Sequence, residues 1–251
     1  MLRTLAASAL ILGLAACATG PAPRVATDYQ PLLDASTRPA ADKADDAARK
    51  PTEILAFMNI KGGETVLELE AGRGYFSELL AGAVGLNGKL IVQNPPEFPQ
   101  YYAAEEARIN GRLPNATLSK ARFVDLGLAT GSVDKVVWIL GPHELYYVPK
   151  DTKGFGEPAK AYSEIARVLK PGGEFIAMDH AAAAGAPTTT GGTVHRIDPA
   201  VVKDMATKAG LKFVDESKIL ANPQDDHTKG VFDSTLRRHT DQFLYRFVKA
   251  K

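Results

Sequence analysis

TVLELEAGRG, residues 65–74, is the stretch that decides the fold class of this 251-residue chain. Its first five residues are mostly apolar and predict a buried strand, and residues 76–84 follow with the apolar pattern of a helix. Between them, Gly72 and Gly74 permit a tight turn and a close approach of the backbone to a ligand. Ligands of open α/β sheets bind at such turns, beyond the carboxyl ends of the strands. The stretch therefore predicts a strand–turn–helix unit with a binding site at its turn.

The rest of the chain alternates between strand-like and helix-like segments and shows no second domain. Further strands are expected at residues 90–92, 116–119, 135–140, 174–178, 212–219 and 242–248. Helices are expected at residues 101–110, 157–169 and 199–209, with Asp198 as the N-cap of the last, and in two short segments between residues 40 and 58. This alternation predicts an α/β protein with a mostly parallel, seven-stranded sheet and helices on both faces.

Composition and charge exclude several kinds of partner and bond. The formal net charge is +1, and no basic stripe with interleaved aromatic residues is present, so we expect no nucleic-acid partner. Cys17 is the only cysteine, which excludes disulfides within the chain and cysteine-based zinc sites. We expect a small-molecule substrate, and the oligomeric state is left open.

The first residues have the pattern of an export signal. Arg3 precedes an apolar run over residues 5–14, which is too short for a permanent transmembrane helix and is typical of a signal peptide. The run ends in Leu14-Ala15-Ala16-Cys17, which resembles the lipobox of bacterial lipoproteins, where cleavage leaves the cysteine as the lipid-bearing first residue. An ordinary secretory signal with a chance cysteine is the alternative.

The lipobox resemblance implies three parts of the chain. We expect residues 1–17 to be a signal peptide, residues 18–40 to be a flexible tether rich in Ala, Pro, Thr and Asp, and residues 41–251 to be the folded domain. A lipid on Cys17 would hold the protein at a membrane surface, on the periplasmic side of the cell envelope.

Two glycine turns resemble those of class I S-adenosylmethionine (SAM) methyltransferases. Residues 68–74 resemble the E/D-x-G-x-G-x-G motif, with Glu70 in place of the first glycine. Residues 169–175, LKPGGEF, resemble the turn that precedes the fifth strand in those enzymes. The resemblance covers about residues 40–251. It implies a Rossmann-like class I methyltransferase fold, methyl transfer and SAM as the cofactor.

The same resemblance implies where the cofactor lies. Glu68, Gly72 and Gly74 match its motif. The ribose is usually held by an acid at the end of the second strand, where this chain has Gln93 and Asn94, whose amides can also bind hydroxyl groups. These two residues are alternatively polar residues of a turn. Asp125, after the third strand, is a further candidate near the adenine, or else a surface acid.

Histidines follow the strands where chemistry is expected. His143 comes after the fourth strand, His180 directly after Asp179 at the end of the fifth, and His195 in the next loop. The carboxyl ends of neighbouring parallel strands share one crevice, so we expect these four side chains to lie in a common region. We assign them as catalytic residues, with His143 or His180 as the base that deprotonates the methyl acceptor.

The whole pattern resembles a group of exported, predicted bacterial methyltransferases with a degenerate glycine motif. The pieces that carry this resemblance are Arg38-Pro39 with Asp42, Asp45, Arg49 and Pro51; residues 72–76; residues 143–146; residues 179–181; residues 195–198; and residues 240–243. It implies SAM-dependent methyl transfer and says little about the acceptor.

Two other functions fit the same residues. The replaced glycine and the missing ribose acid also suit a lipoprotein that binds SAM or a similar nucleoside without catalysis. Alternatively, His143, His180, His195 and Asp179 could form a metal enzyme of another reaction class, since histidine and carboxylate suit transition metals. No H-x-x-x-H pair fixes such a site, so our leading interpretation assigns no metal.

Overall fold

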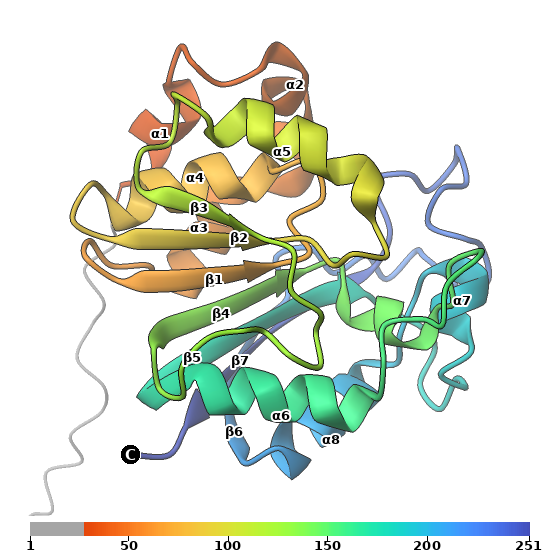
Figure 1. The fold of residues 1–251 in the computed structure, drawn as a ribbon. Helices are drawn as coiled ribbons and strands as arrows, with labels where there is room; N and C mark the ends of the chain where they lie inside the picture. Colours follow the sequence, from red (N-terminus) through yellow and green to blue (C-terminus); the bar gives the residue numbers. More distant parts are fainter. Residues whose placement is uncertain (1–27) are drawn as a thin grey trace, which may run out of the picture.

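A computed structural model describes residues 28–251 of the chain (Figure 1). The predicted signal peptide, Cys17 and the first part of the predicted tether lie outside the described residues. The strands are β1 Thr65–Leu69, β2 Lys89–Gln93, β3 Ala116–Ser119, β4 Val133–Ile139, β5 Leu169–His180, β6 Leu211–Ser217 and β7 Gln242–Lys249. The helices are α1 Gln30–Asp34, α2 Ala40–Arg49, α3 Pro51–Met58, α4 Tyr75–Val84, α5 Tyr102–Ile109, α6 Pro158–Val168, α7 Thr190–Val194 and α8 Pro199–Lys208, with 3-10 helices η1 Pro99–Tyr101 and η2 Pro142–Tyr146.

The predicted sheet is confirmed. Its seven strands run in the order β3-β2-β1-β4-β5-β7-β6. β7 runs in the opposite direction to the other six strands and is therefore antiparallel to both β5 and β6. From β1 the chain moves outward through β2 to β3, and then returns to the other side of β1 to build β4 and β5. In open α/β sheets, ligands bind next to such a reversal, here beyond the carboxyl ends of β1 and β4.

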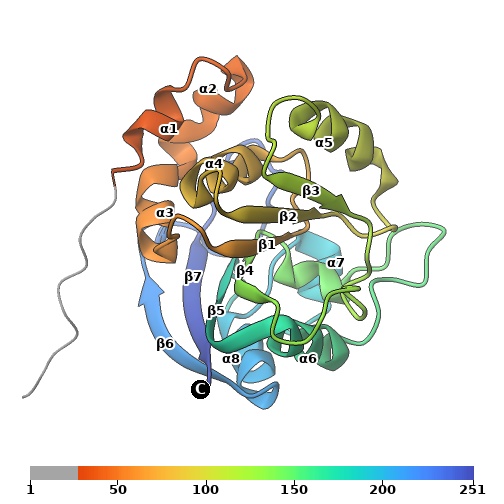
Figure 2. The ribbon, with the colours of Figure 1, turned by 60° about the vertical axis from the view of Figure 1, so that its left-hand side comes forward.

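The same reversal places helices on both faces of the sheet. Because crossovers between parallel strands are right-handed, helices that lead outward in opposite directions must cover opposite faces. Figures 1 and 2 show α1 to α5 on one face and α6 with α8 on the other. A separate buried apolar cluster fills each interface: one includes Leu55, Leu79 and Met178, and the other Trp138 and Tyr162.

The predicted tether is folded from Asp28 onward, which differs from our expectation of a flexible segment up to residue 40. Tyr29 is 2% exposed and its hydroxyl donates a hydrogen bond to the Ile60 carbonyl. The Arg38 guanidinium is buried and pairs with both carboxylate oxygens of Asp46, each at 2.7 Å. Composition suggested a linker, but the burial of Tyr29 and this bidentate ion pair fix the segment to the domain.

The turn before the fifth strand also differs in detail from the prediction. β5 begins at Leu169, which pairs with Val133, while Glu174 pairs with Lys135. Five steps on β5 therefore match two on β4, so residues 170–173 bulge out of the ladder. A side chain on Gly173 would come within 2.9 Å of the Asp134 carbonyl oxygen. The predicted turn is thus a bulge within the strand, which needs a residue without a side chain at this point.

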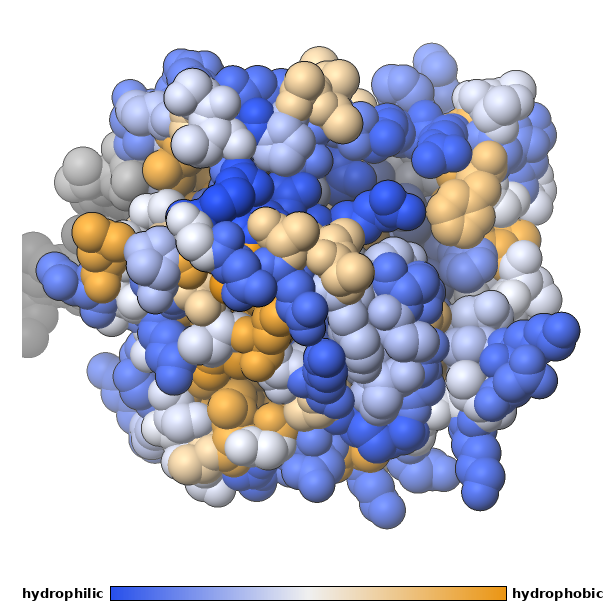
Figure 3. Space-filling model, turned by 45° about the horizontal axis from the view of Figure 1, so that its top comes forward, coloured by the Kyte–Doolittle hydropathy of each residue, from blue (hydrophilic) through white to orange (hydrophobic). Residues whose placement is uncertain are grey.

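The outer surface of the α1–α5 layer is mainly hydrophilic. Figure 3 shows this side with apolar residues only in small, separate patches. Among residues 28–251, no helix is long and apolar enough to cross a membrane.

Candidate functional site

The glycine turn after β1 has a backbone that few side chains tolerate. Glu70, Gly72 and Gly74 have φ angles of +50°, +61° and +78°, all in the left-handed region. A Cβ atom on Gly72 would meet nothing within 4 Å, so this backbone faces open space. A Cβ atom on Gly74 would lie 2.8 Å from Cδ of Arg108. Gly72 therefore lets a ligand approach, while Gly74 makes room for the Arg108 side chain.

Gln93 and Asn94 hold the turn itself. The Asn94 amide accepts a hydrogen bond from the Gly72 N–H and donates one to the Gly72 carbonyl, both at 3.0 Å. Gln93 Oε1 accepts the Glu70 N–H at 2.9 Å, and its Nε2 donates to the Ala121 carbonyl. Both side chains are fully buried. The structure thus brings these predicted ribose ligands to the turn, with their amides bound to the backbone.

The other two predicted cofactor residues lie in different surroundings. Glu68 is buried beneath the turn, where Ser77 Oγ donates a hydrogen bond to it at 2.6 Å. Burial and the nearby Glu105 raise the pKa of Glu68 to about 8. Asp125 is exposed and accepts the Gly127 N–H within its own turn, so the structure does not bring it to the others.

Glu70 is a site residue that we did not assign from the sequence. Its carboxyl accepts a hydrogen bond from Trp138 Nε1 at 3.1 Å. Burial, together with the charge of Glu144, holds the pKa of Glu70 well above its ordinary value. A signal was present in the sequence, because Glu70 stands where the motif has its first glycine.

Asp179 fixes the position of His143. Its carboxylate accepts the His143 backbone N–H at 2.7 Å, and the ring Nδ1 lies 2.8 Å from Asp179 Oδ1. Burial alone would lower the pKa of His143, but Asp179 and Glu144 outweigh it and raise this pKa to about 10. With Nδ1 on the aspartate, the Nε2 atom is turned toward Glu144 and His195.

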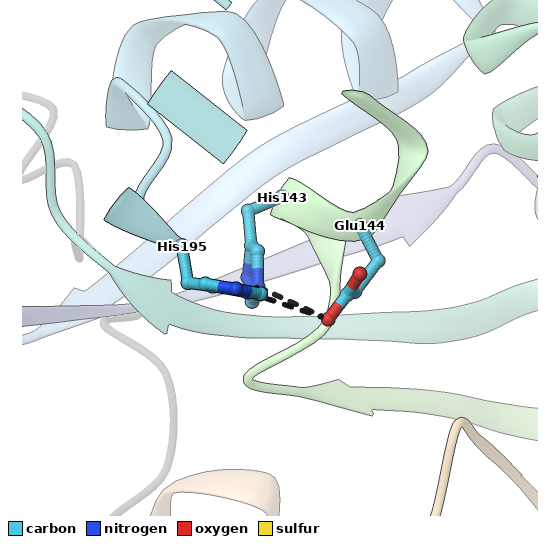
Figure 4. A group of neighbouring side chains, drawn as sticks. All are labelled: His143, Glu144 and His195. Carbon is cyan, nitrogen blue, oxygen red and sulfur yellow. Dashed lines mark hydrogen bonds and ion pairs between the residues drawn. The ribbon is translucent and has the colours of Figure 1, made fainter. Parts of the chain in front are cut away.

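Glu144 and His195 complete a cluster with His143 (Figure 4). His143 and Glu144 come from η2, and His195 follows α7. His143 Nε2 lies 3.2 Å from His195 Nδ1 and 3.3 Å from Glu144 Oε1, and the His195–Glu144 distance is 3.7 Å. We did not assign Glu144 from the sequence, although it neighbours His143. Within residues 28–251, these three groups form the cluster that could hold a metal ion.

His180 lies on the other side of the sheet from this cluster. Successive side chains of β5 alternate between faces, so Asp179 and His180 point to opposite sides. The His143 and His180 ring centres are 6.4 Å apart, and His180 Nδ1 lies 2.6 Å from Thr240 Oγ1. Burial and the charge of His143 hold the pKa of His180 well below its ordinary value. The four predicted catalytic residues are thus close together, but they face two regions.

The region that His180 faces is a cavity of about 160 Å³. Phe76, Leu140 and Met178 form part of its apolar lining, and Arg49, Arg237 and Arg238 its basic part. Arg49 and Arg238 both pair with Asp45. A cavity of about 150 Å³ holds a molecule the size of benzene, so this one suits a small ligand.

Arg196 and Asp198, which follow His195, have structural roles here. The Arg196 side chain is fully buried, with Nη2 2.9 Å from Asp225 Oδ2. Asp198 is the predicted N-cap, confirmed by its side chain accepting the Ala200 N–H at 2.8 Å. Together they fix the loop that carries His195.

Comparison with known proteins agrees with this architecture. Residues 67–177 match the family model described as a methyltransferase domain. A SAM-dependent methyltransferase from Aquifex aeolicus is 18% identical, with a TM-score of 0.59 over 88% of this chain and 98% of that one. One from Mesorhizobium loti is 15% identical, with a TM-score of 0.58 over 82% and 99%. YcgJ from Bacillus subtilis is 15% identical, with a TM-score of 0.54 over 79% and 99%. No curated protein matches the chain.

The chain therefore has the Rossmann-like class I methyltransferase fold. The solved structures share this fold, and the family match spans β1 to β5 with both glycine turns. Together these findings support the enzyme class predicted from the sequence, a SAM-dependent methyltransferase, with SAM as its cofactor.

The turn suits SAM through its backbone. The open space at Gly72 permits close approach of a ligand. Gln93 and Asn94 support the turn from behind. We therefore expect Gly72 to contact the cofactor.

Proposed function

We propose that the protein transfers a methyl group from SAM to a small acceptor that carries an acidic group. The observation that carries this proposal is the cavity of about 160 Å³ whose lining includes Phe76 of α4, Leu140 after β4 and Met178 of β5. Its apolar lining suits the body of a small organic molecule. Of its three arginines, Arg49 and Arg238 share Asp45 and Arg237 is exposed, so this basic part can also pair with an anionic group of the acceptor.

His180 is the general base in this proposal. The sulfonium of SAM supplies an activated methyl group, so the protein must align the acceptor and remove its proton. The Thr240 hydroxyl can accept the Nδ1–H of His180, which leaves the lone pair of Nε2 for the proton. His143 is less suited because its Nδ1 is bound to Asp179 and its Nε2 faces Glu144 and His195.

Calorimetry and turnover assays test this function in two steps. We expect SAM to bind with one site per chain, and radiolabelled methyl transfer to small carboxylic acids but not to their amides. His180→Ala should lower turnover about 10²–10⁴-fold and leave SAM affinity unchanged. His239→Ala, an exposed histidine, is the matched control. SAM binding without turnover of any acceptor would instead indicate a binding protein.

Arginine variants test the acceptor class. Arg237→Glu should raise the KM for an anionic acceptor and leave SAM affinity unchanged, because the exposed Arg237 lines the cavity. Lys212→Glu, an exposed change of the same charge on β6, should change neither quantity. Equal KM values for the two variants would show that the acceptor does not use this cavity.

We also propose that the protein is exported and held at the periplasmic side of a membrane by a lipid on Cys17. The support is the sequence alone, namely the apolar run over residues 5–14 that ends in a lipobox-like tetrad. Lipid chains would place the domain within reach of acceptors at the membrane surface.

A further inference from the structure

We propose that His143, Glu144 and His195 bind a divalent transition-metal ion of the zinc type. The proposal does not depend on methyl transfer, because it concerns a different face of β5 from the one that His180 occupies. Figure 4 shows the three side chains converging from η2 and from the loop after α7. The proposed ligand set contains Glu144 in place of His180 and Asp179, which the sequence suggested as ligands.

The spacing of the three ligand atoms matches that around a metal ion. His143 Nε2, His195 Nδ1 and Glu144 Oε1 form a triangle with sides of 3.2, 3.3 and 3.7 Å. Zinc lies about 2.0–2.2 Å from such nitrogen and oxygen ligands, so tetrahedral geometry separates two ligand atoms by about 3.3–3.6 Å. An ion fits at the centre of this triangle without movement of the backbone.

Burial and an unpaired oxygen give an independent reason for a cation. His143 is 3% exposed and Glu144 is 8% exposed. Glu144 Oε2 is buried and has no hydrogen-bond partner. A buried carboxylate that lacks a partner at one oxygen is costly, and a cation bound at Oε1 would offset this cost by neutralising the charge of the group.

Asp179 orients His143 as carboxylates do in metal sites, where they accept a hydrogen bond from a metal-binding histidine. Metal-binding histidines usually donate their second ring N–H to a carboxylate or carbonyl, which fixes the tautomer and the ring orientation. Asp179 Oδ1, 2.8 Å from His143 Nδ1, is such a partner, and Asp179 itself is fully buried. This hydrogen bond leaves the Nε2 lone pair directed at the centre of the triangle.

The backbone around His195 serves the same arrangement. His195 has a φ angle of +54°, a left-handed conformation that is strained for a non-glycine residue. Gly191 of α7 packs so closely on η2 that a Cβ atom there would lie 2.4 Å from the His143 carbonyl oxygen. The strained backbone at His195 and the close packing of Gly191 thus hold His195 beside His143.

A fourth coordination position would open to solvent. The His195 side chain is 25% exposed, and its ring contacts Phe232, which is 67% exposed. Sites with three protein ligands and an open position bind water or a substrate oxygen at that position. The set of two histidines and one carboxylate suits Zn²⁺, Fe²⁺, Co²⁺ and Ni²⁺.

Zn²⁺ titration of the full-length protein, purified in detergent and stripped with a chelator, tests the site. We expect one Zn²⁺ per chain by calorimetry, and visible absorption bands when Co²⁺ replaces it. His195→Ala, a partly exposed position, should weaken Zn²⁺ binding at least about 100-fold, and Asp179→Asn about 10–100-fold. His227→Ala, which removes another histidine–carboxylate pair, is the matched control.

Three results would overturn the proposal. One is no Zn²⁺ binding by the folded wild-type protein, which would mean that a proton shared between His143 and Glu144 satisfies the cluster. Another is equal Zn²⁺ affinity of the wild type and His195→Ala. The third is loss of Zn²⁺ in His180→Ala, which would favour the ligand set first suggested by the sequence. None of these measurements uses SAM, so they leave the proposed methyl transfer untouched.

Discussion

Replacing Glu68 by glutamine should make the protein more stable at alkaline pH. Glu68 is 3% exposed, and its pKa is raised from 4.5 to about 8, first by burial and then by Glu105. The folded state therefore keeps a proton on Glu68 between these pH values, while the unfolded state loses it. Because the folded pKa is the higher one, this contribution to stability is complete below pH 4.5 and is lost as the pH rises through about 8.

The size of the effect follows from the two pKa values. They differ by about 3.5 pH units, and each unit corresponds to about 1.36 kcal/mol, so the wild type loses up to about 5 kcal/mol of stability from this group. The amide of Glu68→Gln stays neutral at every pH and can still accept the Ser77 hydroxyl. The variant should thus match the wild type near pH 5 and exceed its free energy of unfolding above pH 8.

Urea unfolding at pH 5, 7 and 9 measures this difference. Glu216→Gln on β6 is the control, because Glu216 is exposed and its removal should give no pH-dependent change. The reasoning would be refuted if the difference between Glu68→Gln and the wild type were the same at all three pH values. It would also be refuted if the variant were less stable at pH 9, since that would mean that an ionised Glu68 stabilises the fold.

Three further predictions concern other parts of the molecule. Asp225→Ala should lower the free energy of unfolding by about 3–5 kcal/mol, because it leaves the buried Arg196 guanidinium without its ion-pair partner. The exposed Asp226→Ala should change it little, and a loss below about 1 kcal/mol in Asp225→Ala would contradict the prediction. Gly72→Val should abolish SAM binding in calorimetry, whereas Gly127→Val should not, although Gly127 has a similar φ of +64° and also faces open space. Normal SAM binding by Gly72→Val would show that the glycine turn is not part of the site. Cys17→Ala should shift the protein from the membrane to the soluble fraction or leave it unprocessed, and unchanged membrane association would reject a lipid anchor there.

Sequence periodicity was sufficient to predict the layers of the fold. β1, β4 and β7 coincide with short, mainly apolar runs between glycine or polar turns. Such a pattern can be recognised from residues that are close together in the sequence. The same holds for the cap at Asp198, where an acid precedes Pro199 at the start of a helix. The segment over residues 28–40 was not predictable in this way, because its order depends on contacts of Tyr29 and Arg38 with distant residues.

The histidine cluster shows the same division between local and tertiary information. The sequence placed His143 and Asp179 at the carboxyl ends of neighbouring strands, and topology alone then brings them together. It did not show that His180 faces the opposite side of β5, or that Glu144 is the third member of the cluster with His195. The meeting of Glu144 with His195 depends on the 3-10 helix η2 and on the left-handed backbone at His195, which tertiary packing imposes.

The chain by itself thus determined the order of its elements, the place of the glycine turn and the edge of the sheet where the histidines gather. Only the tertiary structure decided which polar atoms meet there. Gln93 and Asn94 illustrate the reason. From the sequence we expected their amides to bind a ribose, but in the folded protein these amides form hydrogen bonds with the backbone of the turn. Buried polar groups pair with whatever the fold brings near them, and that partner can lie at any distance along the chain.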